Sequence, residues 1–222
     1  AAGVQHNTSG IISRKGEGMD TPKGLEGKKY ATWDAPIEKA MMENVVEADG
    51  GDFSKVELIP STVTDEVSAL ESKSVDAIWI FYAWAGVATE VAGLETDYFA
   101  FKDINPAFDY YTPVIIGNNE FLEKEPETAK KFLSAVKKGY EDAIEDPDGA
   151  AEILCEAAPE LDQELVKASQ EYLKDQYIAD ADRWGYIDPD RWNLFYNWLN
   201  ENGLTENETP ENTGFYNESL PE

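Results

Sequence analysis

Aromatic and acidic residues placed directly after strand-like runs are the first candidates for chemistry in this sequence. Trp33 and Asp34 follow one short run, and Tyr82 and Trp84 lie at the end of a longer apolar run. Ligands of open parallel sheets bind beyond the carboxyl ends of the strands, where loops and helix starts converge. Rings in such loops offer faces on which a flat heteroaromatic molecule stacks, and the Asp34 carboxylate accepts hydrogen bonds from an exocyclic amine. The pattern therefore predicts a binding site for a planar solute.

Composition argues against most other chemistry. The 18 basic and 45 acidic residues give a formal net charge of −27, which repels nucleic acid and anionic membrane surfaces. Cys155 is the single cysteine and His6 the single histidine, too few for a disulfide, a zinc motif or an iron–sulfur site. The sequence has no P-loop, GxGxxG or GxSxG motif, so we expect no metal, no cofactor and no catalytic centre. No run approaches the roughly 18 apolar residues of a membrane span.

Alternating strand-like and helical patterns predict an α/β fold, with a three-layer sheet domain that contains parallel strand pairs. The later sequence is helical, and residues 126–146 form its longest amphipathic segment. The last helix, 189–202, has Asp188 as its cap, Pro189 in its first turn and Gly203 as its stop. One more helix is expected between Asp34 and Gly50, and three others at 64–71, 147–158 and 162–176. The expected strands are 28–32, 56–59, 77–82, 98–102 and 111–116.

Two further segments complete the candidate site, because each lies where the chain is expected to cross between lobes. Asn7, Thr8 and Ser9 supply polar groups, and Tyr110 and Tyr111 supply two more rings. A structural interpretation stands beside the functional one. In it the aromatic residues pack the lobes, and Asp34 only caps a helix. Both interpretations stay open on the sequence alone.

The segment 21–30, TPKGLEGKKY, resembles the Leu-x-Gly-Lys signature of bacterial extracytoplasmic solute-binding proteins with the two-lobed periplasmic-binding-protein fold. Further strings resemble the branch that binds thiamine pyrimidine precursors, a relative of the sulfonate, taurine and nitrate binders. These strings are residues 5–10, 33–36, 76–82 and 184–188. One departure is Ala85, which stands where relatives often carry an acidic residue.

The resemblance implies a type II periplasmic-binding-protein-like α/β fold. Residues 21–110 would be a complete α/β lobe, and residues 1–20 and 111–222 would be the remainder of the other lobe, its return strand and covering helices. Family members carry a longer N-terminal part, so the resemblance implies an incomplete lobe. Its open sheet edges would favour a homodimer.

The resemblance also implies a function: the extracytoplasmic solute-binding component of an ABC importer, in the periplasm or as a cell-surface lipoprotein. Such a protein is not an enzyme. It would capture a small planar heteroaromatic nutrient, a thiamine pyrimidine precursor, and deliver it to a membrane permease.

Three alternatives remain. The first is a sulfonate, taurine, nitrate or riboflavin binder of the same fold, although neither aromatic loop has the Lys or Arg that anion sites often use. The second is an enzyme similar to the pyrimidine synthases, which use a histidine, a cofactor-attaching lysine and a cysteine-rich motif. One cysteine and one histidine do not supply that set. The third is a truncated fragment that binds nothing and self-associates.

Overall fold

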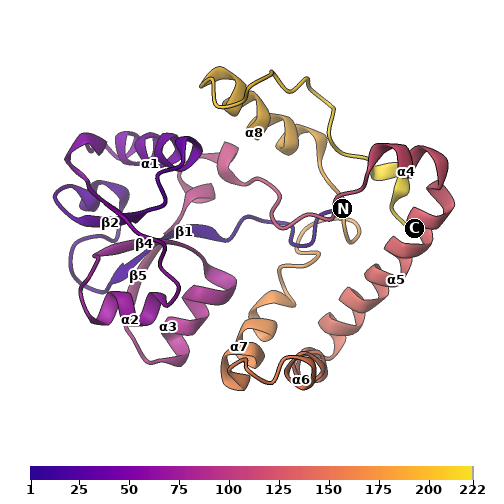
Figure 1. Ribbon diagram of the computed structural model, residues 1–222, viewed down its shortest axis with the longest axis horizontal. Coiled ribbons are helices and arrows are strands. Elements are labelled where there is room, and N and C mark those ends of the chain that lie inside the picture. Colours follow the sequence, from indigo (N-terminus) through magenta and orange to yellow (C-terminus); the bar gives the residue numbers. More distant parts are fainter. Residues whose placement is uncertain (222) are drawn as a thin grey trace. The chain divides into compact units, whose positions relative to one another are not determined.

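A mixed five-stranded sheet organises residues 8–108 (Figure 1). Its strands are β1 (Ser9–Arg14), β2 (Lys29–Thr32), β3 (Glu57–Pro60), β4 (Ala77–Phe81) and β5 (Thr96–Ala100). Their order across the sheet is β3-β2-β4-β1-β5. The predicted parallel pairs are present, because β2 runs parallel to both β3 and β4. The antiparallel pairs of β1 with β4 and β5 were not predicted.

The computed structural model describes residues 1–221, which divide into two units. The sheet unit comprises Thr8–Phe108 and Trp198–Glu208, and the helical unit comprises Ala1–Asn7, Asp109–Asn197 and the residues from Thr209 onward. The sequence predicts instead that 1–20 belong with 111–222. Residues 8–20 lie with the sheet because β1 is hydrogen-bonded to a strand on each of its sides.

One edge of the sheet, here called the carboxyl edge, contains the last residues of β2, β3, β4 and β5 and the first residues of β1. Ser9 lies opposite Phe81 of β4, and Gly10 lies opposite Ala100 of β5. Because β1 is antiparallel to these strands, its first residue shares an edge with their last residues. Strands β2 and β3 end at the same edge, since both run in the direction of β4. The loops after β2 and β4 therefore leave the sheet beside the segment that enters β1.

Helices cover both faces of the sheet, which makes the three layers that the sequence predicts (Figure 1). Helix α1 (Pro36–Ala48) covers one face and buries Met41, Met42, Val45 and Val46. Helices α2 (Glu66–Glu71) and α3 (Val87–Val91) lie on the other face. There Leu70 of α2 packs in one cluster with Ile78 and Ile80 of β4. Apolar side chains on both faces hold β4 in the middle of the unit.

The helical unit is built around a smaller apolar core. Leu133, Trp184 and Leu220 are buried together in it. Its helices are α4 (Asn119–Lys124), α5 (Pro126–Glu145), α6 (Pro147–Ala157), α7 (Gln163–Leu173) and α8 (Pro189–Glu201), the last belonging to this unit as far as Asn197. No helix within residues 1–221 is both long enough and apolar enough to cross a membrane.

Two local predictions for this unit have opposite outcomes. The start of α8 is confirmed, because the Asp188 carboxylate accepts a hydrogen bond from the Arg191 amide at 2.9 Å. The strand expected at 111–116 is wrong. Val114 forms only an isolated bridge with Ala2, and the neighbouring Pro113 has no amide hydrogen with which to extend a ladder.

Candidate functional site

The loop after β2 presents an indole ring at the carboxyl edge. The Trp33 side chain is 51% exposed, and its ring packs edge-to-face on Trp79 of β4 with 5.2 Å between centroids. Trp79 in turn packs on Phe101, just after β5, at 4.2 Å. The exposed Trp33 ring therefore rests on Trp79 in the middle of β4, which in turn packs on the buried Phe101. Sequence reasoning missed Trp79 and Phe101, because both lie inside apolar runs that predict core.

A buried carboxylate sets the conformation of this loop. Glu38 of α1 is 2% exposed and accepts hydrogen bonds from the hydroxyls of Tyr30 (2.7 Å) and Thr32 (3.0 Å). It also accepts one from the Ala35 amide at 3.3 Å. Burial, and then the hydrogen bond and charge of Glu38, raise the pKa of Tyr30 far above its usual range. The phenol thus remains a proton donor, and the first turn of α1 is tied to β2.

Asp34 has a different role from the predicted helix cap. Ala35 is the residue that caps α1, while Asp34 adopts a left-handed backbone conformation with φ of 64°. Its amide donates to the Thr32 hydroxyl at 2.9 Å, which stabilises the turn. Its carboxylate is exposed and forms an ion pair with Lys39 of α1. The charge of Lys39 is thus already matched by the Asp34 carboxylate.

The loop after β4 is a π-helical turn, Tyr82–Gly86, that leads into α3. Such turns occur often at functional sites. The Tyr82 ring packs on Tyr98 with 4.7 Å between centroids, and its hydroxyl bonds to Glu90. Gly86 lies against this ring, since a Cβ there would come within 2.5 Å of it. The turn leaves the Trp84 side chain 42% exposed.

The segment that enters β1 forms hydrogen bonds with the loop that carries Tyr82 and Trp84. Thr8 and Ser9 are both buried. The Thr8 carbonyl accepts hydrogen bonds from the Tyr82 amide at 2.9 Å and from the Tyr98 hydroxyl at 2.8 Å. Thr8 therefore holds the π-helical turn in place, and its burial favours a positioning role over a direct ligand contact.

The remaining three candidates belong to the helical unit. The Asn7 amide donates to Asp109 at 2.9 Å, and the Asn7 side chain is fully buried. Tyr110 stacks on Phe195 with 4.3 Å between ring centroids. Tyr111 is buried, carries the Arg191 guanidinium 4.0 Å above its ring, and accepts a hydrogen bond from the Asp188 amide. In this unit the rings of both tyrosines already have partners.

The structure thus divides the nine predicted residues between the two units. Six share the carboxyl edge of the sheet unit: Thr8, Ser9, Trp33, Asp34, Tyr82 and Trp84. Trp33 and Trp84 are the most exposed aromatic rings among them. Within residues 1–221, no cluster of histidine, cysteine and acidic side chains is suited to hold a metal ion.

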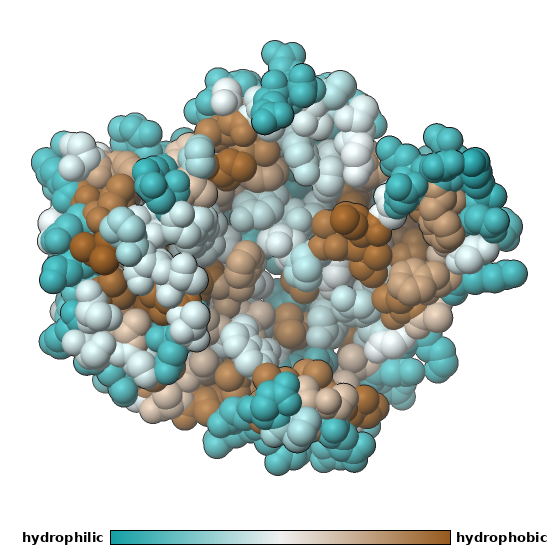
Figure 2. Space-filling model, viewed as in Figure 1, coloured by the Kyte–Doolittle hydropathy of each residue, from teal (hydrophilic) through white to brown (hydrophobic). Residues whose placement is uncertain are grey.

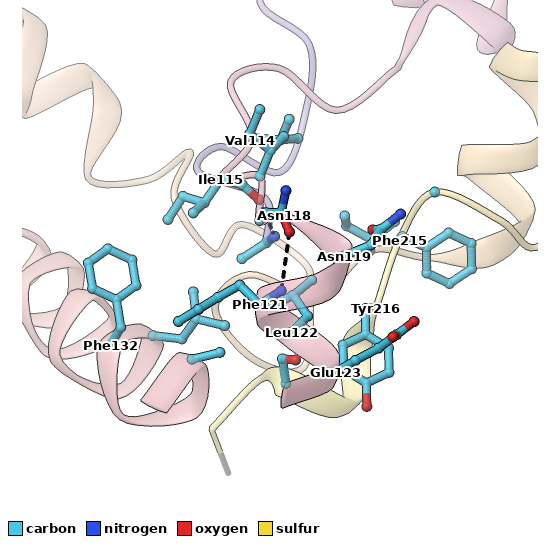
Figure 3. Close-up of a pocket in the computed structure, with 18 of the residues that line it drawn as sticks. Val114, Ile115, Asn118, Asn119, Phe121, Leu122, Glu123, Phe132, Phe215 and Tyr216 are labelled. Atoms are coloured by element: carbon cyan, nitrogen blue, oxygen red, sulfur yellow. Dashed lines mark hydrogen bonds between the residues drawn. The ribbon is translucent and has the colours of Figure 1, made fainter. Parts of the chain in front are cut away.

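The helical unit contains an apolar groove that the sequence does not predict. The groove encloses about 750 Å³ and is lined by hydrophobic side chains from the segment 114–117, from α4 and α5, and from the segment 214–216 (Figure 3). Exposed hydrophobic side chains also gather beside α4 and the first turns of α5 (Figure 2). They include Ile116, Phe121 and Phe132. None of the nine predicted residues lines this groove.

Comparison with known proteins identifies relatives by sequence. A family described as "NMT1/THI5 like" matches residues 1–150. The formylaminopyrimidine-binding protein of Halalkalibacterium halodurans is 26% identical over 197 residues, which cover 85% of this chain and 58% of that protein. The chain therefore spans less than two thirds of that relative.

Solved structures agree on the fold. The alkanesulfonate-binding protein SsuA of Xanthomonas axonopodis pv. citri, bound to MOPS, superposes with a TM-score of 0.65 at 10% identity, over 99% of this chain and 71% of that one. The desulfurization enzyme DSZB superposes with a TM-score of 0.57 at 12% identity, over 92% of this chain and 72% of that one. The expected periplasmic-binding-protein-like α/β fold is confirmed, and the same fold also serves an enzyme.

Proposed function

Because this chain belongs to the NMT1/THI5-like family, we propose that it is the solute-binding component of an ABC importer. It acts outside the cytoplasm, captures a planar heteroaromatic nutrient and presents it to a membrane permease. The ligand class is a thiamine pyrimidine precursor, as the name of the formylaminopyrimidine-binding relative suggests.

The observation that carries the proposal is the exposure of two indole rings at one edge of the sheet. Trp33 follows β2, Trp84 follows β4, and these two strands are parallel neighbours. Neither ring is needed to complete the apolar core, since each leaves about half of its surface to solvent. Large exposed rings next to strand ends suit stacking on a flat ligand, because an indole face makes its most extensive contact with another planar ring.

The charges of the same edge favour a neutral or aminated ring over an anion. Asp34 adds an exposed carboxylate beside Trp33, and Lys39 is paired with it. A carboxylate accepts hydrogen bonds from an exocyclic amine, whereas a sulfonate would meet it as a like charge. A sulfonate binder remains the second candidate, since sulfonate-binding proteins share the fold.

The contacts of the single histidine and the position of the single cysteine are consistent with a role without catalysis. His6 contacts two carboxylates, Asp109 and Asp180, at 2.6 and 2.8 Å. Cys155 lies on α6 and is partly buried. A pyridoxal phosphate titration would separate the enzymatic alternative, because an internal aldimine absorbs in the visible range and the proposal expects no such band.

The decisive experiment measures ligand binding to the wild-type chain and to two tryptophan variants. A formylaminopyrimidine at about 100 times its dissociation constant should stabilise the wild type by about 2.7 kcal/mol, which is a rise in Tm of about 5–10 °C. Trp33→Ala and Trp84→Ala should each weaken binding at least about tenfold by calorimetry. Tyr216→Ala is the matched control, because Tyr216 has the same exposed fraction as Trp33 but lies in the helical unit.

Two outcomes would contradict the proposal at different levels. If riboflavin, taurine, nitrate or an alkanesulfonate raises Tm and no pyrimidine does, the ligand class is wrong. If a pyrimidine binds equally well to the wild type and to both tryptophan variants, the site is wrong although the function stands.

A further inference from the structure

His6 lies between two carboxylates in the helical unit. Its Nδ1 is 2.6 Å from an oxygen of Asp109, and its Nε2 is 2.8 Å from an oxygen of Asp180. An ionised carboxylate can only accept hydrogen bonds, so both contacts are favourable only when both ring nitrogens carry a proton. The geometry is therefore that of an imidazolium cation.

Arg191 is the other charged group that faces His6, and it opposes a proton on Nδ1 because a guanidinium N–H can only donate. Arg191 of α8 approaches from the same side, with Nη1 3.2 Å from Asp109 and 3.0 Å from Nδ1 of His6, and Nη2 bonds to Gln5. Its charge and the partial burial of the ring oppose protonation of His6. The hydrogen bond to Asp109, followed by that to Asp180, outweighs both and raises the pKa of His6.

The contacts of His6 join three separate parts of the chain. Asp109 also accepts a hydrogen bond from the Asn7 amide, so one carboxylate holds two consecutive residues of the N-terminal segment. After Asn7 the chain passes into the sheet unit, and at Asp109 it returns. Asp180 lies in the segment 174–183 between α7 and α8, and that segment is also held by the Gln5 amide on the Gln176 carbonyl.

We propose that His6 is a pH-operated latch that fastens the segment 174–183 to the two chain crossings. Loss of one proton leaves a neutral ring with a single N–H. The latch requires that proton to stay on Nδ1, where it bonds to Asp109, the closer and far less exposed partner. Nε2 and Asp180 then face each other as two acceptors, and they separate. A proton kept on Nε2 would instead preserve the Asp180 contact while Nδ1 accepted from Arg191 Nη1. Protection of 174–183 that does not change with pH would reveal that tautomer and overturn the proposal. The latch is closed below the pKa of the bound imidazole and opens above it, whichever ligand the sheet unit binds.

The single histidine makes the test direct. In the wild-type chain, NMR titration of the imidazole should give a pKa above the ordinary value of about 6.5. Hydrogen exchange of peptides from 174–183, corrected for intrinsic rates, should show protection that decreases as pH rises through that pKa. Asp180→Asn should lower the pKa of His6 and remove the pH dependence of this protection. Asp180 is exposed, so the variant should remain folded.

Two controls separate a latch from a merely structural contact. Asp182→Asn makes the same charge change two residues away and should leave the titration of His6 unaltered. His6→Gln should keep the protection of 174–183 constant with pH. The proposal is overturned if the imidazole titrates at or below its ordinary pKa. It is equally overturned if Asp180→Asn titrates like the wild type, or if protection changes with pH in His6→Gln as it does in the wild type.

Discussion

Replacing Glu38 with alanine should destabilise the sheet unit and weaken ligand binding together. The side chain is buried and accepts hydrogen bonds from Tyr30, Thr32 and the Ala35 amide. In Glu38→Ala the Tyr30 hydroxyl, itself 1% exposed, loses its acceptor in a site that water does not reach. The turn that carries Trp33 loses its anchor to α1 at the same time.

The magnitude follows from the three bonds. A buried donor left without an acceptor costs about 1–3 kcal/mol, and loss of a contact that caps a helix costs about 1 kcal/mol. The Thr32 hydroxyl, also 1% exposed, loses its acceptor as well but still accepts from the Asp34 amide, so we leave it out and the sum is a lower bound. The sum is about 3 kcal/mol, which for a chain of this length lowers Tm by about 6–12 °C.

Thermal and denaturant unfolding of Glu38→Ala, followed by circular dichroism, measures this loss. Glu47→Ala is the matched control, since Glu47 lies on α1 and is exposed, and it should change stability by less than about 0.5 kcal/mol. A double-mutant cycle with Tyr30→Phe should show coupling of at least about 1 kcal/mol, because Phe has no hydroxyl to leave unpaired. If Glu38→Ala unfolds within 0.5 kcal/mol of the wild type, on the order of a surface substitution, the anchoring role is refuted.

Two further changes test the packing of the π-helical turn and an acid-sensitive ion pair. Gly86→Ala should cost about 1–3 kcal/mol and displace Tyr82, because the backbone of Gly86 is right-handed and the three atoms nearest to the new methyl group all belong to the Tyr82 ring. A Tm equal to that of the wild type would contradict this close packing. The guanidinium of Arg14, by hydrogen bond and charge, lowers the pKa of Glu17 to about 2. The folded-state pKa is thus below the unfolded one, so the stability lost in Glu17→Gln should be constant above about pH 4.5 and shrink as pH falls toward 2. Unfolding midpoints measured from pH 2 to 7 check this, and a loss independent of pH would contradict it.

Elements with strong local signals could be predicted from the sequence. The expected strand 77–82 is β4 (Ala77–Phe81), and the expected helix 126–146 is α5 (Pro126–Glu145). The strand is predicted by a nearly continuous apolar run and the helix by apolar residues at helical spacing, and a polar residue or a proline marks the start of each. These signals lie within a few residues of one another, so no tertiary information is needed to read them.

Strand β1 could not be predicted from local signals of this kind. Its sequence, SGIISR, has Ser13 and Arg14 at its end, yet all six residues are buried. Arg14 is accommodated because its guanidinium donates to the carbonyls of Leu70 and Val75, both at 2.9 Å. Both partners are more than 50 residues from Arg14 in the sequence, so no local pattern predicts these hydrogen bonds.

The candidate site was predictable in its exposed parts and not in its supports. Trp33 and Trp84 were found because rings in loops after apolar runs stand out in a sequence. Glu38 was not found, since an acidic residue in the first turn of a helix is ordinary. Its role depends on Tyr30 and Thr32 being turned toward it across the α1–β2 interface.

The carboxylates of this chain act in two ways, locally and at long range. Some are matched to donors within the fold, as Glu38 is to Tyr30 and Asp76 is to Arg14 at 2.7 Å. The excess of acidic over basic residues gives the net charge of −27, which acts at long range on anything that approaches. A neutral planar ligand is not subject to this repulsion, whereas a sulfonate has to overcome it before any contact forms. The recognition that we propose at the carboxyl edge therefore rests on the faces of Trp33 and Trp84, and both the global charge and the local Asp34 carboxylate favour the proposed ligand class over a sulfonate.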